Sequence, residues 1–232
     1  MQGALVFMNL HVDALFTHDE HGRIVRSNEP DGALAPRFFL GLTKGGFVRR
    51  YRYDLDGQTV SALESAFENV SNDDEFAISK CVAKCSAILA TSAAIERSSA
   101  GPAYSFPNNI DPTDDSVVLV TEANQHILLT YLPAWLPDVT LSAPLFARVV
   151  DNHAVAVCGS VRITPSAHEA GVETAKEFRG QGYAMEVVSA WARSLKTSSI
   201  EPLYSTSWEN LASQAVARKL GLIEFGHDVQ IT

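Results

Sequence analysis

The strongest constraint in this sequence is a glycine-rich turn between an expected strand and an expected amphipathic helix. The strand ends near Thr174, the turn reads Arg179-Gly180-Gln181-Gly182-Tyr183-Ala184, and the helix spans 182–196. Glycines allow the backbone to approach a ligand closely. The N–H groups of a first helical turn point at one spot, and the helix dipole adds partial positive charge there. The segment therefore predicts a pyrophosphate site, to which Arg179 adds a charged contact.

The elements around this turn predict a mixed sheet with helices. Expected strands cover 117–121, 144–151, 154–164, 168–174, 202–208 and 222–232, and expected helices cover 122–136, 182–196 and 210–220. Antiparallel strands come first, and an alternation of strands and helices follows. This order indicates an α/β (α+β mixed sheet) fold.

The spacing of the turn is neither the Rossmann G-x-G-x-x-G nor the P-loop pattern. It matches R-x-x-G-x-A, the acyl-CoA pyrophosphate motif of the GNAT superfamily. A second signature follows, Ser207-Trp208-Glu209-Asn210-Leu211-Ala212-Ser213 and then Ala217-Arg218-Lys219-Leu220-Gly221-Leu222, with Leu222 where Phe is common. Residues 101–232 thus resemble a GNAT N-acetyltransferase domain.

The resemblance implies acetyl-CoA as cosubstrate, no metal, and a set of binding residues. Backbone groups of Val172 and Thr174 are expected to pair with the pantetheine arm, as an added strand does. Backbone N–H groups of Arg179, Gly180, Gln181, Gly182, Tyr183 and Ala184 are expected to hold the pyrophosphate. Asn210 aligns with a polar residue near the reacting end, although its place before a helix also suits an N-cap.

The sequence departs from the family at the residue that donates a proton to the leaving thiolate. Many members carry a Tyr at the position of Ala217. A branch acting on protein N-termini has Asn-x-x-Ser instead, which Asn210 and Ser213 match. Ser213, Tyr183 or water is left as the donor.

A base must also take a proton from the acceptor amine. The family often has a Glu on the strand before the turn, where this chain has His168, Glu169 and Glu173. Period two places His168, Val172 and Thr174 on one face and the two glutamates on the other. We rank Glu169 first, then His168, then Glu173, so the predicted catalytic residues are Glu169, His168 and Ser213.

The first half predicts a separate small domain. Residues 1–100 are interpreted as an accessory α+β domain, substrate-shaping or regulatory, with a strand at 10–19 and helices at 59–70 and 75–97. A Ser-, Pro- and Asn-rich stretch at 98–116 is typical of a linker. The second domain is then the acetyltransferase, 101–232.

Composition limits the classes of binding partner and the cellular setting that we expect. A net charge of −9 disfavours nucleic acid, and no apolar run is long enough for a membrane helix. Three cysteines without a framework favour a reducing, cytoplasmic setting. The resemblance implies a small-molecule or peptide amine as acceptor, and a homodimer is left open. A non-catalytic acyl-CoA-binding sensor or regulatory module is the alternative function.

Overall fold

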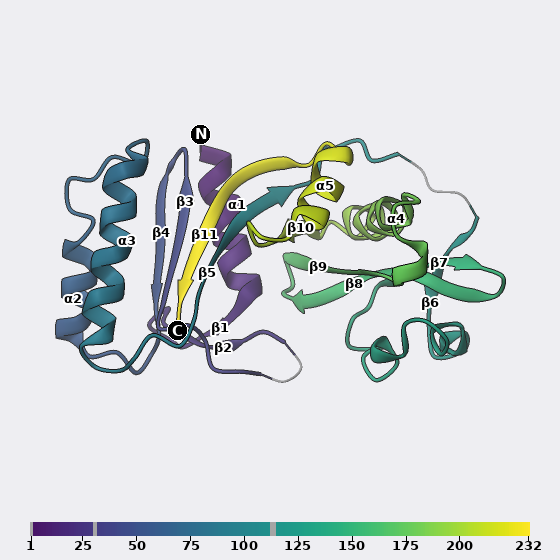
Figure 1. Cartoon of the computed structure of the whole chain (residues 1–232), viewed down its shortest axis with the longest axis horizontal. Helices are drawn as coiled ribbons and strands as arrows, with labels where there is room; N and C mark the ends of the chain where they lie inside the picture. Colours follow the sequence, from purple (N-terminus) through teal and green to yellow (C-terminus); the bar gives the residue numbers. More distant parts are fainter. Residues whose placement is uncertain (1, 30–31, 112–114) are drawn as a thin grey trace. The chain divides into compact units, whose positions relative to one another are not determined.

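The computed structural model describes residues 2–29, 32–111 and 115–232. The chain forms two compact units (Figure 1). Unit 1 comprises 1–103 together with 224–232, and unit 2 comprises 104–223. The sequence-based ranges, 1–100 and 101–232, remain a prediction about domains, but 224–232 lie with unit 1. Within the described ranges, no helix is long and apolar enough to cross a membrane.

Unit 1 is built on a sheet in the order β4-β3-β11-β5. Its elements are α1 (Gln2–Leu15), β1 (Phe16–His18), β2 (Ile24–Ser27), β3 (Phe38–Thr43), β4 (Gly46–Tyr51), α2 (Gly57–Ser65), α3 (Glu75–Ala90), β5 (Ser98–Ser105) and β11 (Ile223–Ile231). β11 pairs antiparallel with β3, from His227 opposite Leu42 to Ile231 opposite Phe38. β1 and β2 form a separate two-stranded sheet.

Helices cover both faces of the unit 1 sheet. One face places Phe38, Leu40 and Tyr51 against apolar residues of α2 and α3, including the buried thiols Cys81 and Cys85. On the other face α1 lies on β3 and β4. There Met8 fills the space over Gly41, where an added Cβ would come within 2.4 Å of its sulfur.

Unit 2 has a mixed sheet in the order β10-β9-β8-β7-β6. Its elements are β6 (Val117–Val120), η1 (Gln125–Leu128), η2 (Pro133–Trp135), β7 (Leu145–Val150), β8 (His153–Ile163), β9 (Ala167–Thr174), η3 (Lys176–Phe178), α4 (Tyr183–Thr197), β10 (Glu201–Ser205) and α5 (Leu211–Lys219). β9 and β10 are parallel, and the other pairs are antiparallel. The predicted mixed α+β fold is confirmed.

Alternation along β8 separates the two cores of unit 2. Ala156 and Cys158 face α4 and contribute to a core with the buried Trp191 and Leu195. Val157 points to the opposite face, where the η1 and η2 segment supplies Leu128 and Leu132 among others. α4 thus backs one side of the sheet, and the short helices cover the other (Figure 1).

Several sequence-based elements need correction. The helix predicted at 182–196 is confirmed as α4. The strand predicted at 10–19 is wrong up to Leu15, where α1 ends, and only Phe16–His18 form a strand, β1. The single helix predicted at 122–136 is wrong as well. Pro133 lacks an N–H group and disfavours helix in the residue before it, so two short 3-10 turns form instead. The predicted linker begins as β5, and its residues 112–114 lie outside the described residues.

Candidate active site

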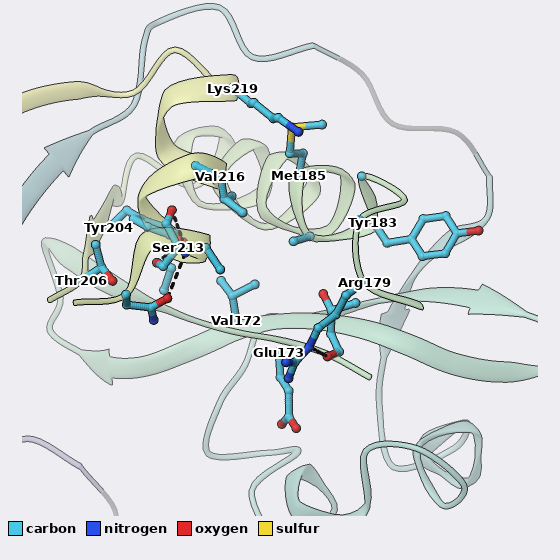
Figure 2. A pocket seen from close by; sticks show the side chains of 18 of the residues that line it. Val172, Glu173, Arg179, Tyr183, Met185, Tyr204, Thr206, Ser213, Val216 and Lys219 are labelled. Atoms are coloured by element: carbon cyan, nitrogen blue, oxygen red, sulfur yellow. Dashed lines mark hydrogen bonds between the residues drawn. The ribbon is translucent and has the colours of Figure 1, made fainter. Parts of the chain in front are cut away.

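A pocket of about 720 Å³ opens in unit 2 where β9 and β10 separate. In the described chain, the parallel pairing runs from Glu201 opposite Ala167 to Leu203 opposite Glu169 and ends there. β9 nevertheless continues to Thr174. The pocket lies between these diverging strand ends, the turn before α4, and one side of α5 (Figure 2). An extended ligand can therefore occupy the position that a further strand would take.

The open edge of β9 presents backbone groups to this pocket. Ala175 N–H donates to the carbonyl of Val155 on β8, at 2.9 Å. Because backbone groups of successive strand residues point to opposite edges, those of Val172 and Thr174 point away from β8. Both residues line the pocket. The Thr174 carbonyl already accepts Nε of Arg179 at 3.2 Å, which leaves Val172 as the more available partner.

The turn before α4 depends on two glycines in left-handed conformations. Gly180 has φ 80° and Gly182 has φ 91°, values that other L-residues rarely adopt. Gly182 is the N-cap of α4, and no described side chain caps this helix start. The first N–H groups of α4 are thus available at the pocket wall, where Gly180, Gly182 and Tyr183 lie. This is the geometry of an anion site.

Tyr183 is the first residue of α4, but its side chain faces away from the centre of the pocket. The Arg148 guanidinium lies 4.9 Å from the centre of its ring, and Nη1 of Arg148 donates to Glu186 at 2.8 Å. Figure 2 shows the Tyr183 hydroxyl pointing away from Ser213 and Tyr204. This orientation weakens Tyr183 as a proton donor.

Two hydroxyls meet at the pocket wall between β10 and α5. The Tyr204 hydroxyl lies 2.7 Å from Oγ of Ser213 (Figure 2). Burial raises the pKa of Tyr204 to about 12, and its bond to Ser213 opposes this rise only in part. The phenol therefore stays protonated near neutral pH.

Asn210 has a structural role in addition to its place in the pocket. Its Oδ1 accepts the backbone N–H of Ser213 at 3.0 Å, so it is the N-cap of α5. Gln214 fixes the loop before this helix by donating to the carbonyls of Ser207 and Trp208. Together these bonds hold the β10–α5 wall of the pocket in place.

The three candidate bases occupy different surroundings. His168 and Glu169 are buried and do not form part of the pocket wall, whereas Glu173 does. Nδ1 of His168 lies 2.8 Å from Oγ of Ser160, which also accepts Nε1 of Trp191 at 3.0 Å. The Ser160 hydroxyl can therefore donate to His168 while it accepts from Trp191. Burial lowers the pKa of His168 and favours its neutral form.

The two glutamates lie on the sheet face opposite α4. Glu169 accepts the hydroxyl of Ser205 at 3.0 Å, and Ser205 lines the pocket. Glu173 accepts Nε1 of Trp135 at 2.7 Å. The predicted division of β9 into two faces is therefore observed.

The position of the Trp135 indole depends on two glycines, which have no side chain to occupy the space of its ring. Gly159 and Gly171 are register partners on β8 and β9. A Cβ on either would come within 3.1 or 3.2 Å of the Trp135 ring. Trp135 can hold Glu173 because these glycines leave room for the ring.

Comparison with known families agrees with this geometry. The model of the GNAT acetyltransferase family matches residues 146–227. The C-terminal half of this chain belongs to that family. A GNAT acetyltransferase from Colwellia psychrerythraea is 15% identical and covers 87% of this chain and 82% of its own, with a TM-score of 0.51. That likeness establishes the shared fold.

Two further GNAT structures are similar over less of their length. A protein assigned to the GNAT family from Novosphingobium aromaticivorans is 17% identical, with a TM-score of 0.49; the match covers 59% of this chain and 65% of that one. A GCN5-related N-acetyltransferase-like protein from Streptococcus suis is 15% identical, with a TM-score of 0.44 and coverage of 59% and 62%. This chain thus spans less than two thirds of either protein. No curated protein matches the sequence.

In this GNAT domain most of the predicted binding residues come together. Val172, Thr174, Arg179, Gly180, Gly182, Tyr183, Ala184, Asn210 and Ser213 line one pocket, and Gln181 does not. Sequence reasoning missed Tyr204, Ser205 and Lys219, which also line it. Lys219 could have been found, because it follows Ala212 and Val216 at helical spacing. Among the described residues, no group of three His, Cys, Asp or Glu side chains is arranged to hold a metal ion.

Proposed function

We propose that this protein is an acetyl-CoA-dependent N-acetyltransferase that acetylates a primary amine of a small molecule or peptide in the cytoplasm. The observation that carries the proposal is the continuity of one pocket. It runs from the point where β9 and β10 separate, along the open edge of β9, to the glycine turn before α4. A long thioester cosubstrate with an anionic end suits such a pocket.

The pocket residues fit acetyl-CoA in three places. Val172, with Thr174, offers backbone groups to the amides of the pantetheine arm. The turn from Arg179 through Gly180, Gln181, Gly182 and Tyr183 to Ala184 offers N–H groups and the Arg179 guanidinium to the pyrophosphate. Asn210, at the start of α5, lines the pocket and is proposed to contact the reacting end of the cosubstrate through its side-chain amide.

The chemistry needs a base on one side of the thioester and a proton donor on the other. The amine nitrogen attacks the acetyl carbon, the C–S bond breaks, and the amine proton passes to a base. We propose Glu169 as this base, acting through the Ser205 hydroxyl that joins it to the pocket. His168 and Glu173 are the alternatives. Ser213, held by Tyr204, donates to the departing sulfur.

Residues 1–100 are proposed to form an accessory domain, substrate-shaping or regulatory. A purely binding or sensory role for the whole chain is the second candidate. It is favoured by one observation: position 217, where many family members carry a Tyr, holds an Ala that is buried in the core beside Trp191.

Thiol release tests the proposal. The protein is incubated with acetyl-CoA and a mixed pool of primary amines, polyamines and peptides, and free CoA thiol is measured against a reaction without amines. We expect amine-dependent release that Glu169→Gln reduces at least tenfold, within the range for loss of a general base. Tight binding of acetyl-CoA without amine-dependent release would instead support the sensor.

A further inference from the structure

We infer that Lys219 recognises the 3′-phosphate of CoA, so that the pocket prefers CoA over 3′-dephospho-CoA. The inference rests on the proposed function, because it names a specificity residue within the same pocket. It concerns the 3′-phosphate, which the contacts proposed above for β9 and the glycine turn do not include.

The position of Lys219 follows from the helix that carries it. Ala212, Val216 and Lys219 recur at helical spacing and line the pocket along one side of α5. At 1.5 Å per residue, Lys219 lies about 10 Å along the helix axis from Ala212. Figure 2 shows Ser213 at the end of α5 near Tyr204 and Lys219 at the other end. Lys219 is therefore remote from the reacting end of the pocket.

The charged residues of the pocket also support a phosphate contact by Lys219. The charged side chains in its wall are Arg179, Lys219 and Glu173, in a protein whose net charge is −9. Arg179 belongs to the turn before α4 and donates to Thr174 in the same strand-turn segment. Lys219 comes from a different element and brings a second, separate cation to the wall.

CoA carries its negative charge in two separate places. The pyrophosphate is matched by the turn before α4, and the ribose 3′-phosphate is a monoester with a charge of about −1.5 to −2 near neutral pH. An ammonium group acts on phosphate as a point charge and needs no fixed fork geometry. The two cations of the pocket thus correspond to the two anionic groups of the ligand.

Lys219 could alternatively serve only the helix. Basic residues in a last turn stabilise the negative end of the helix dipole. α5 has two such residues, Arg218 and Lys219, and both are exposed. Arg218 shares the turn and the charge but is not part of the pocket wall. It is therefore a matched control, because a dipole role would affect both residues alike.

The experiment is calorimetric titration of the full chain with CoA and with 3′-dephospho-CoA. We expect the wild type to bind CoA about tenfold more tightly than dephospho-CoA, a difference of about 1.4 kcal/mol. Lys219→Gln should reduce this ratio to about twofold or less by weakening CoA binding alone. Lys219→Arg and Arg218→Gln should keep the wild-type ratio.

The possible outcomes distinguish a failure of this inference from a failure of the proposed function. Equal affinity of the wild type for the two ligands, or an unchanged ratio in Lys219→Gln, would overturn the role of Lys219 and leave CoA binding intact. Equal loss of the ratio in Arg218→Gln would point to the helix end rather than to Lys219. Failure of the wild type to bind either ligand would refute the proposed function and this inference with it.

Discussion

At the scale of single residues, we propose that the Tyr204 hydroxyl replaces the tyrosine hydroxyl that is missing at position 217. Position 217 on α5 is Ala, and its side chain is fully buried in the core. A tyrosine hydroxyl reaches the pocket wall from β10 instead, through Tyr204, which lies 2.7 Å from Ser213. Because burial raises the pKa of Tyr204 to about 12, its proton remains in place at neutral pH. In the proposed mechanism, this pair keeps the Ser213 hydroxyl directed at the departing thiolate.

This pair leads to a kinetic prediction. Tyr204→Phe and Ser213→Ala should each lower kcat for acetyl transfer by roughly tenfold to a hundredfold, with little change in KM for acetyl-CoA, because the donor acts after binding. The double variant should lose no more than the worse single one, as residues acting as a unit do. Initial-rate kinetics on the four proteins check this.

Tyr104→Phe is the control for packing. Tyr104 belongs to the same core, and its ring centre lies 6.4 Å from that of Tyr204. If Tyr104→Phe lowered kcat as much as Tyr204→Phe, the effect would come from the core and not from the donor. Fully additive losses in the double variant would also contradict a shared role.

At the scale of secondary structure, the site depends on how α4 begins. The two glycines of its turn have positive φ, and Gly182 is the N-cap residue. An added Cβ at Gly182 would meet only the terminal carbon of Met185, at 3.6 Å. A side chain there is thus opposed by backbone conformation rather than by crowding. It would also stand beside the N–H groups proposed to bind pyrophosphate.

Comparing two isosteric substitutions at Gly182 isolates the effect of a negative charge on CoA affinity. Gly182→Asp and Gly182→Asn should both lose about 1–2 kcal/mol of folding stability from the left-handed backbone. Only the carboxylate adds repulsion, of the order of 4 kcal/mol per charge pair at about 4 Å before screening. CoA affinity should therefore fall at least tenfold further in Gly182→Asp than in Gly182→Asn. Melting curves and calorimetric titration measure the two effects, and equal affinities would remove the anion site from this turn.

The same scale shows what sequence could predict. α4 was predictable because its apolar residues recur at helical spacing and a glycine turn precedes it. α1 was not, because apolar residues follow one another in 4–16 without a clear polar face, and a short window of them also suits a strand. The pocket side of β9 was predictable from period two. Tyr204 and Ser205 were missed because their roles depend on where β10 separates from β9, which is a tertiary feature.

At the scale of the whole molecule, the two compact units are not two consecutive segments of the chain. Unit 1 takes residues 224–232, which follow unit 2 in the sequence. In its sheet β11 lies between β3 and β5. Ile231 of β11 is fully buried in the core with Phe38 and Leu63. Unit 1 therefore contains a central strand from outside its first continuous segment.

This arrangement predicts how fragments behave. Residues 1–105 alone should show no cooperative thermal unfolding, because β3 and β5 lack the strand between them. Joining 1–105 to 223–232 through a two-residue Asn-Gly turn should restore it, since Oγ of Ser105 lies 3.4 Å from the Ile223 carbonyl. Circular dichroism melts compare the fragments, with Ile231→Asp in the joined version as control. A cooperative melt for 1–105 alone would contradict a central role for β11.

The position of β11 also affects the order of events during translation. Domains generally fold as units while the chain is being made, the N-terminal one first. Here the ribosome must finish 104–223 before it delivers the strand that pairs with β3. Unit 2 can thus begin to fold while the earlier segment still exposes an unpaired edge on β3. Until β11 arrives, this edge is open to wrong partners, and a chaperone that shields strands would act on the segment made first.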